Sequence, residues 1–353
     1  MSMVADEFRF VVGVDTHAAT HTYSIIDTAG REIDQQQFPT SPAGLARAVA
    51  WIGRRTAGDL DGTLISVEGT GTYGAVLAAR LATLGYRVVE APTPRRDPAA
   101  GKDDALDSLS AARSTLTMRT AKLRDRRGGG GEDTAQARLA LQVLLTARDQ
   151  ATGERTGALN ALTALLRTHD LGLDARRPLT NAQIATIAAW RARPTEPVGL
   201  ATARAYAVRL ARRITDLATQ LAENLDQIQS LVTQRAPVLL EATGVGPVTA
   251  AVVLTTWSHP GRVRSEAAFA AIAGAAPIPA SSGNTQRHRL NRGGDRRLDR
   301  ALHTIVLTRM RCDPTTKAYV ERRLAEGKTR REIRRALKRY PARQLYRTLN
   351  ATT

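Results

Sequence analysis

The sequence predicts an α/β protein with an N-terminal domain of strands and helices, a long helical middle and a mainly helical C-terminal domain. Three observations support this prediction. Short apolar runs bounded by turn residues fill the N-terminal part, an apolar repeat with steps of three and four residues runs through the middle, and basic residues dominate the C-terminal part. The expected domain boundaries are 1–127, 128–235 and 236–353.

The composition is that of a globular protein with a packed core. Of the 353 residues, 42% are hydrophobic and 24% are charged, which is the usual balance for a folded chain. The single cysteine, Cys312, excludes an internal disulfide, and neither a signal-peptide pattern nor an apolar run of bilayer length is present. We therefore expect a soluble, cytoplasmic protein that has no membrane partner and associates with the nucleoid when active.

The net charge of +18 points to a polyanionic partner. Between Arg287 and Arg347 there are 20 Lys and Arg residues against six Asp and Glu residues, so most of the excess charge is C-terminal. No strongly apolar helix face accompanies this charge, which favours nucleic acid, above all double-stranded DNA, over a membrane surface. Aromatic residues make up 4% of the chain, so phosphate contacts are expected to outweigh base stacking.

The N-terminal domain is predicted to contain three strands followed by alternating helices and strands. Apolar runs between turn residues predict strands over 8–15, 20–27, 31–38, 63–70 and 86–92. Helices are expected over 41–55, 73–85 and 103–116. The first helix opens with Ser41 as a suitable N-cap and Pro42 at the first helical position. This order of elements is the one found in RNase H-like α/β domains.

The middle segment is predicted to be helical. The glycine run Gly128–Gly131 indicates a hinge, and the helices are expected to break near Pro178, Pro194 and Pro197. One apolar seam is formed by Leu210, Ile214, Leu217, Leu221, Leu225, Ile228 and Val232. This seam predicts either a coiled coil that joins copies of the chain or two helices that pack within one chain.

Four acids are candidates for a metal site. Asp15 ends the first predicted strand and Glu68 the fourth, whereas Asp104 and Asp107 are three residues apart on one face of the next helix. If the first and fourth strands are neighbours, the four carboxylates converge, and divalent cations, Mg²⁺ or alternatively Mn²⁺, relieve their repulsion. Two such ions stabilise both oxygens of a phosphodiester displacement. In the alternative interpretation, each acid is a solvated strand end or helix cap.

Two nearby features are less suited to metal binding. Asp103 adjoins Asp104, but only Asp104 lies three residues before Asp107. His17 and His21 have the spacing of zinc ligands on a helix, yet they fall on a strand and its turn, where residues four apart do not face one site. We therefore do not expect a zinc site.

The C-terminal domain contains two turns that suit phosphate binding. Gly244 and Gly246 lie in a Gly-Val-Gly-Pro turn between two predicted helices, a helix-hairpin-helix-like arrangement whose amides can bind phosphate. The second turn contains Ser281 and Ser282, which the residues alone describe as turn residues or phosphate donors. The cations expected to contact nucleic acid are Arg287, His288, Arg289, Arg292, Arg296 and Arg297.

Six stretches of the sequence resemble, in order from residue 11 to residue 303, the DEDD transposases of bacterial insertion sequences, which are related to pilin-gene invertases and bridge-RNA-guided recombinases. These stretches are VVGVDTH, VEGTGTYG, GKDDALDS, GVGPVTAA, SEAAFAAIAGAAPIPASSG and RHRLNRGGDRRLDRALH. The resemblance implies a RuvC-like N-terminal domain whose metal site is Asp15, Glu68, Asp104 and Asp107. It also implies a nucleophilic serine in a Ser-Gly motif that matches Ser282. The sequence departs from the family pattern at two positions beside the acids. Asp103 stands where the family usually has Ser or Thr, and Ser108 stands where it usually has Ala.

The resemblance implies a DNA transposase or site-specific recombinase. Ser282, which the sequence cannot separate from Ser281, would attack DNA and store the bond energy as a phosphoserine. A noncoding RNA from the element would pair with target and donor DNA. Four strand cuts require four active serines, for which the resemblance suggests a tetramer; the expected assembly is a homo-oligomer, a dimer or a tetramer. The alternatives are a RuvC-like, structure-selective DNA nuclease without a covalent intermediate, and a non-enzymatic nucleic-acid-binding protein.

Overall fold

The computed structural model describes residues 2–92, 104–126, 131–285 and 288–351. Asp103, Arg287 and most of the Gly128–Gly131 run lie outside the described residues. The chain forms two compact units. The N-terminal unit comprises Met1–Gln136 together with Trp257–Arg264, and the C-terminal unit comprises Ala137–Thr256 and Ser265–Thr353.

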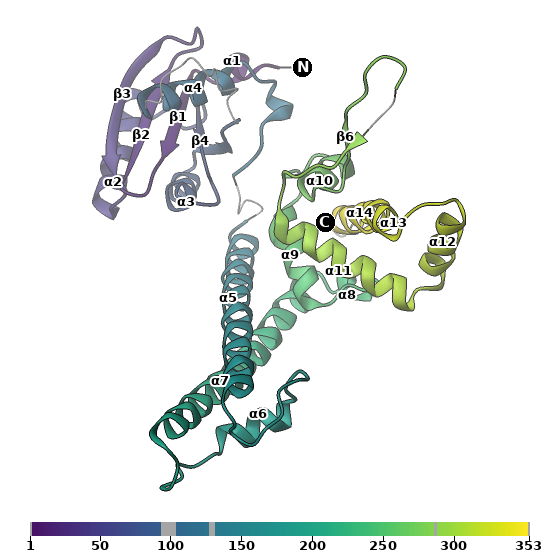
Figure 1. The fold of residues 1–353 in the computed structure, drawn as a ribbon. Coiled ribbons are helices and arrows are strands. Elements are labelled where there is room, and N and C mark those ends of the chain that lie inside the picture. Colours follow the sequence, from purple (N-terminus) through teal and green to yellow (C-terminus); the bar gives the residue numbers. More distant parts are fainter. Residues whose placement is uncertain (1, 93–103, 127–130, 286–287, 352–353) are drawn as a thin grey trace. The chain divides into compact units, whose positions relative to one another are not determined.

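The N-terminal unit is built on a five-stranded mixed sheet (Figure 1). Its strands are β1 (Phe10–Thr16), β2 (Thr20–Ile26), β3 (Glu32–Pro39), β4 (Thr63–Val67) and β5 (Arg87–Glu90), in the spatial order β3-β2-β1-β4-β5. The strands β1, β2 and β3 are antiparallel, whereas β4 pairs parallel to both β1 and β5. This arrangement confirms a mixed α/β domain compatible with the RNase H-like fold, with the first and fourth strands as neighbours.

Helices cover both faces of this sheet. They are α1 (Val4–Glu7), α2 (Pro42–Arg55), α3 (Ala75–Thr83), α4 (Asp104–Leu116) and the 3₁₀ turn η1 (Thr120–Lys122). Val12 packs in one apolar cluster with α2 and α3, and its neighbour Val11 packs in another with α4, because successive strand side chains point to opposite faces. The predicted N-cap is confirmed, since Ser41 Oγ accepts a hydrogen bond from Gly44 N at 3.2 Å.

Two long helices dominate the first part of the C-terminal unit: α5 (Glu132–Thr168), which begins at the end of the N-terminal unit, and α7 (Val198–Arg235). Between them lies α6 (Asn181–Ala188). Asn224 Nδ2 donates to Leu144 O at 2.9 Å and Arg148 Nη1 to Leu221 O at 3.0 Å, so α5 and α7 pack antiparallel within one chain. The buried members of the predicted seam are Ile214, Leu217, Ile228 and Val232.

The rest of the C-terminal unit is mostly helical (Figure 1). It contains α8 (Val238–Glu241), α9 (Pro247–Trp257), α10 (Glu266–Ile272), α11 (Arg296–Cys312), α12 (Pro314–Ala325), α13 (Arg330–Leu337) and α14 (Arg339–Ala351). One short antiparallel pair, β6 (Ile278–Pro279) with β7 (His288–Arg289), interrupts the helices. Among the described residues, no helix combines the length and hydropathy needed to cross a bilayer.

Candidate functional site

Two of the predicted acids lie at the same edge of the sheet. Asp15 is the penultimate residue of β1, and Glu68 follows the last residue of β4 directly. The parallel pairing of β1 with β4 continues into the turn, because Glu68 N donates to Val14 O and the Thr16 hydroxyl donates to Glu68 O, each at 3.0 Å. The strand predicted over 63–70 therefore ends early, and Gly69, with φ of 60°, turns the chain away from the sheet.

A row of small residues across three strands brings α4 close to this edge. Ser24, Gly13 and Ser66 lie side by side on β2, β1 and β4. A Cβ atom on Gly13 would lie 2.6 Å from Ala112 N and closer still to the carbonyl oxygen of Ser108. The backbone of α4 therefore rests directly on β1, which is possible only because residue 13 has no side chain.

Hydroxyl pairs fix the position of α4 along the sheet. Ser24 Oγ lies 2.7 Å from Ser108 Oγ, and Ser66 Oγ lies 2.7 Å from Thr115 Oγ1. Gln35 Nε2 adds a hydrogen bond of 2.8 Å to Ala105 O in the first turn of the helix. These buried polar groups satisfy one another, which favours a single register between helix and sheet.

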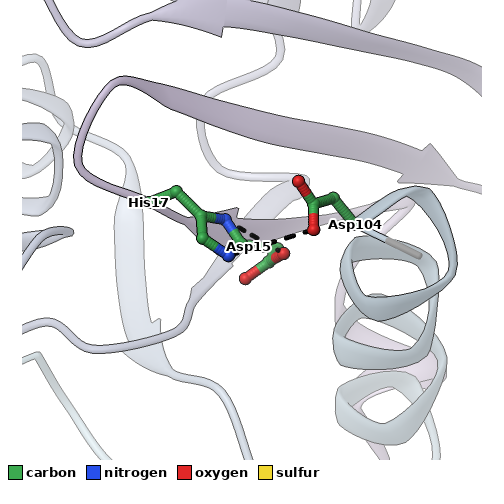
Figure 2. A group of neighbouring side chains, drawn as sticks. All are labelled: Asp15, His17 and Asp104. Carbon is green, nitrogen blue, oxygen red and sulfur yellow. Dashed lines mark ion pairs between the residues drawn. The ribbon is translucent and has the colours of Figure 1, made fainter. Parts of the chain in front are cut away.

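The first turn of α4 carries Asp104 and Asp107, where the positive end of the helix dipole favours carboxylates. Asp104 and Asp15 both lie close to a third residue, His17, as Figure 2 shows. His17 Nδ1 lies 3.5 Å from Asp15 Oδ2, and His17 Nε2 lies 3.9 Å from Asp104 Oδ1. One ligand atom from each of the three residues falls within 4.8 Å of the others.

Asp15 is the buried centre of this group. The residue is 5% exposed, and its Oδ2 atom is buried without a hydrogen-bond partner. Burial raises the pKa of Asp15, the negative charges of Glu68, Asp104 and Asp107 raise it further, and the neighbouring His17 opposes the increase. All four predicted acids are therefore near enough to interact, although Glu68 and Asp107 lie outside the compact group of three.

The site suits a divalent cation. A buried carboxylate oxygen that lacks a hydrogen bond is costly unless a positive charge satisfies it. Several carboxylates around it also repel one another, and a metal ion removes both penalties. The donors present, carboxylate oxygens and one imidazole nitrogen, are common metal ligands.

His17 was missed as a member of the acidic site because the sequence suggested only a pairing with His21. His21 lies on β2, is 2% exposed, and its Nδ1 is 3.1 Å from Thr20 O, so it has no place in the group. The available signal was that His17 follows Asp15 by only two residues, in the turn directly after the first strand, so both side chains belong to the same end of that strand.

The two serines lie at the tip of the β6–β7 hairpin. Ser282 and Thr285 pair antiparallel through two backbone hydrogen bonds of 3.2 and 3.1 Å, which leaves Gly283 and Asn284 as the turn. Gly283 has φ of 55°, a conformation that glycine adopts without strain. Both Ser281 and Ser282 are exposed to solvent.

An open groove of about 1230 Å³ in the C-terminal unit is lined by cationic side chains. Four of the predicted cations line it, namely His288, Arg289, Arg292 and Arg296. Seven further basic residues line it that were not among the predicted six: Arg300 and His303, on the same helix α11 as Arg296, and, later in the chain, Arg331, Arg334, Arg335, Lys338 and Arg339. Burial lowers the pKa of His303, and the charges of Lys338 and Arg334 lower it further, as expected in a positive potential. The signal for the groove was the spacing of arginines in RREIRR, which puts several of them on one helix face.

The remaining predicted residues occupy other environments. Arg297 Nη2 forms an ion pair of 2.7 Å with Asp149 and does not line the groove. Gly244 has φ of 83°, and a Cβ atom there would lie 3.0 Å from Ile305 O, so this glycine permits close packing against α11. The Gly246 amide already donates to Thr249 Oγ1 at 3.0 Å.

Comparison with known proteins assigns both parts of the chain to transposases. Residues 12–169 match a DEDD transposase family of the IS110 type, and residues 236–321 match the transposase IS116/IS110/IS902 family. The chain is 26% identical over 377 residues to the insertion element IS900 uncharacterized 42 kDa protein of Mycobacterium paratuberculosis, which covers 93% of this chain and 92% of that relative.

A second relative is the insertion element IS110 uncharacterized 43.6 kDa protein of Streptomyces coelicolor, 39% identical over 95 residues, which are 27% of this chain and 24% of the relative. The four acids fall inside the first family match, and the serine hairpin falls inside the second. Because a DEDD domain acts through divalent metal ions and a transposase acts on DNA, these matches agree with the acidic site and the basic groove. The chain is therefore a DNA transposase, similar in both matched segments to the IS110/IS116 insertion-sequence transposases, with an N-terminal DEDD domain that uses a divalent metal.

Proposed function

We propose that this transposase cuts and rejoins DNA strands with Ser282 as the nucleophile and with Mg²⁺, or Mn²⁺ in its place, held by Asp15, Glu68, Asp104 and Asp107. The observation that carries the metal site is the buried Oδ2 atom of Asp15, which accepts no hydrogen bond and lies among further carboxylates. When bound, the metal supplies positive charge that stabilises the phosphorane and the departing oxygen.

In the proposed reaction, Ser282 Oγ attacks a DNA phosphorus and loses its proton to a nearby base or to water. The scissile P–O bond breaks, the released sugar oxygen takes up a proton, and the strand end remains attached as a phosphoserine. A sugar hydroxyl of another strand then attacks the phosphoserine and frees Ser282, so the strands are joined without external energy. The exposed position of Ser282 at a hairpin tip supports this role, because an extended duplex can reach it.

The basic groove is the proposed binding surface for the nucleic-acid backbone. Its arginines lie beside β7, the strand that returns from the serine turn, so a phosphate backbone in the groove continues towards Ser282. Long-range attraction to phosphates does not depend on base sequence, which agrees with the low aromatic content. We propose that an RNA encoded by the element selects target and donor DNA by base pairing, while the protein reads the backbone.

The three segments have distinct proposed roles. Residues 1–127 hold the metal, residues 128–235 join copies of the chain into a dimer or tetramer, and residues 236–353 carry the serine and the basic groove. The assembly surface is supported by Leu139 and Val143 on α5, whose side chains are 53% and 59% exposed. Val143 also lines a shallow apolar depression between α5 and α7, together with Leu144 and Leu231.

The decisive experiment detects protein attached to DNA. The transposase is incubated with Mg²⁺ and a plasmid that carries its insertion sequence with the flanking noncoding DNA, and the products are separated under denaturing conditions. We expect a covalent protein–DNA product that contains phosphoserine at residue 282 by mass spectrometry. The product should be lost in Ser282→Ala and Asp15→Asn and retained in Ser281→Ala, the matched control one residue away.

Each contrary result has a distinct meaning. Strand cleavage without attached protein would replace the proposal with a RuvC-like nuclease. An adduct that survives in Ser282→Ala and disappears in Ser281→Ala would move the nucleophile by one residue. DNA binding without any Mg²⁺-dependent strand breakage would mean that the protein is a non-enzymatic DNA-binding protein. Recombination with no RNA in the purified complex would refute the proposed RNA guide.

A further inference from the structure

We propose that His17 is a direct ligand of the metal held by Asp15 and Asp104, so that the centre is a mixed nitrogen–oxygen site that prefers Mn²⁺ to Mg²⁺. This inference deepens the proposed function and rests on its premise that the acids hold a divalent ion. It adds a residue outside the predicted set of four acids and assigns the site a metal selectivity.

The positions of the donor atoms carry the inference. In an octahedral site with metal–ligand distances of about 2.1 Å, neighbouring donors lie about 3 Å apart and opposite donors about 4.2 Å apart. One ring nitrogen of His17 and one carboxylate oxygen from each aspartate lie within 4.8 Å of one another, slightly more than the larger of these values. Nδ1 is the His17 nitrogen near Asp15, 3.5 Å from its Oδ2 atom. Small side-chain rotations therefore bring all three residues onto one ion (Figure 2).

The donor atoms are also available. Among the described residues, His17 Nδ1 and Asp15 Oδ2 are both buried without a hydrogen-bond partner, although each belongs to a side chain that normally finds one. The two atoms face each other across the group, and Asp15 is 5% exposed. Two buried atoms that lack hydrogen bonds and lie 3.5 Å apart are spaced as neighbouring ligands of one ion.

The backbone holds His17 at this position. Its amide donates to Thr20 O at 3.1 Å, which closes the tight turn between β1 and β2. Thr40 Oγ1 donates to Ala18 O at 2.9 Å, and Thr40 N donates to Ala19 O at 3.0 Å, so the turn is tied to the end of β3. A side chain on such a turn is ordered before the metal arrives, as expected of a ligand.

The chemistry of the donors sets the metal preference. Mg²⁺ favours oxygen ligands and binds imidazole weakly, whereas first-row transition ions accept imidazole nitrogen together with carboxylate oxygen. Exchange of one oxygen ligand for His17 therefore raises the affinity for Mn²⁺ relative to Mg²⁺. Each additional carboxylate, from Glu68 or Asp107, remains an acceptable ligand for either ion.

The test measures metal binding directly, with Mn²⁺ alone as the probe and the full-length protein. Electron spin-echo spectroscopy of bound Mn²⁺ detects a coordinated nitrogen through its ¹⁴N modulation. We expect this modulation in the wild type, its replacement by the ¹⁵N pattern after labelling with ¹⁵N-histidine, and its loss in His17→Gln. His169→Gln, at an exposed histidine in the C-terminal unit, should retain it.

Titration supplies a second readout. In His17→Gln, Mn²⁺ should bind about tenfold more weakly or worse, the size of loss found even for residues that only support a ligand. Mg²⁺ affinity, measured by competition, should change much less. His17→Asp restores an oxygen ligand, and we expect it to bind Mn²⁺ without ¹⁴N modulation and with a lower preference for Mn²⁺ over Mg²⁺. The circular dichroism of each variant checks that the fold is retained.

The outcomes separate this inference from its premise. If Mn²⁺ binds stoichiometrically but shows no ¹⁴N modulation, or if the modulation persists in His17→Gln, His17 is only an ion-pair partner of the acids and the inference is wrong while the metal site stands. If Mn²⁺ fails to bind, or binds Asp15→Asn as tightly as the wild type, both the inference and the proposed metal site fail.

Discussion

The contact between Gly13 and α4 allows a quantitative test of how the metal site is built. In Gly13→Ala, the new Cβ atom would lie 2.6 Å from Ala112 N, whereas ordinary van der Waals contact begins at about 3.5 Å. The helix must therefore retreat by about 1 Å, and Asp104 and Asp107 move with its first turn. We expect the overpacked interface to cost about 1–3 kcal/mol in the free energy of unfolding.

The effect on metal binding should exceed the effect on stability. Metal ligands tolerate displacements of only about 0.2 Å, so a shift of about 1 Å should weaken Mn²⁺ binding by about tenfold or more. Urea unfolding and Mn²⁺ titration measure the two effects on the same preparation. The matched control is Gly53→Ala on α2, where the nearest atom is Tyr86 Oη at 3.9 Å. In this control the free energy of unfolding should rise by up to about 1 kcal/mol, and the metal affinity should stay unchanged.

A wild-type metal affinity in Gly13→Ala would refute the reasoning, even if the variant were less stable. It would mean that α4 adjusts locally around residue 13 without moving its first turn. Equal losses of affinity in Gly13→Ala and Gly53→Ala would also refute it, because the second site has room for a methyl group.

Three further predictions concern the acid site, the groove and the helical pair. Because the pKa of Asp15 is raised in the folded protein, the metal-free protein loses stability as pH rises through the range in which carboxyl groups titrate. In urea unfolding, Asp15→Asn should therefore be more stable than the wild type at pH 7, and by a smaller margin at pH 4. Excess Mg²⁺ should make the wild type the more stable protein. Loss of Arg331 and Arg335 to Ala should reduce the slope of log affinity against log salt by about 2 in DNA-binding titrations, while Arg177→Ala, at an exposed site outside the groove, leaves it unchanged. Val143→Lys should sediment as a smaller species with unchanged stability, and a wild-type sedimentation rate would exclude this face as the assembly surface.

The sheet was predictable because its local signals agree with its tertiary contacts. The apolar runs of β1 and β4 are buried on both faces of the sheet. Such runs can be recognised as strands from the sequence without knowledge of the fold. The end of β4 was placed too late, at residue 70, because the turn depends on the left-handed conformation of Gly69. A sequence indicates that glycine permits this conformation but not that the chain adopts it there.

The apolar seam of the middle segment illustrates an ambiguity that local sequence cannot resolve. The same spacing of Leu217 and its neighbours suits a partner helix from another chain or from the same chain. The hydrogen bonds from Asn224 to Leu144 and from Arg148 to Leu221 show that α5 is the partner of α7. Leu217, which is 1% exposed, is therefore an internal residue of the folded chain. A polar residue at Leu217 would therefore test stability, and only exposed positions such as Val143 test assembly.

By itself, the sequence determined the order of strands and helices, the candidate acids Asp15, Glu68, Asp104 and Asp107, and the basic character of the C-terminal half, because periodicity, residue type and charge are local properties. Only the tertiary structure decided which atoms meet. The absence of a side chain at Gly13 lets α4 rest on β1, which brings Asp104 to His17 and Asp15 from far along the chain. Likewise, the cations of α11, α13 and the hairpin form one groove only after folding, because surface charge becomes a binding site through the convergence of separate elements.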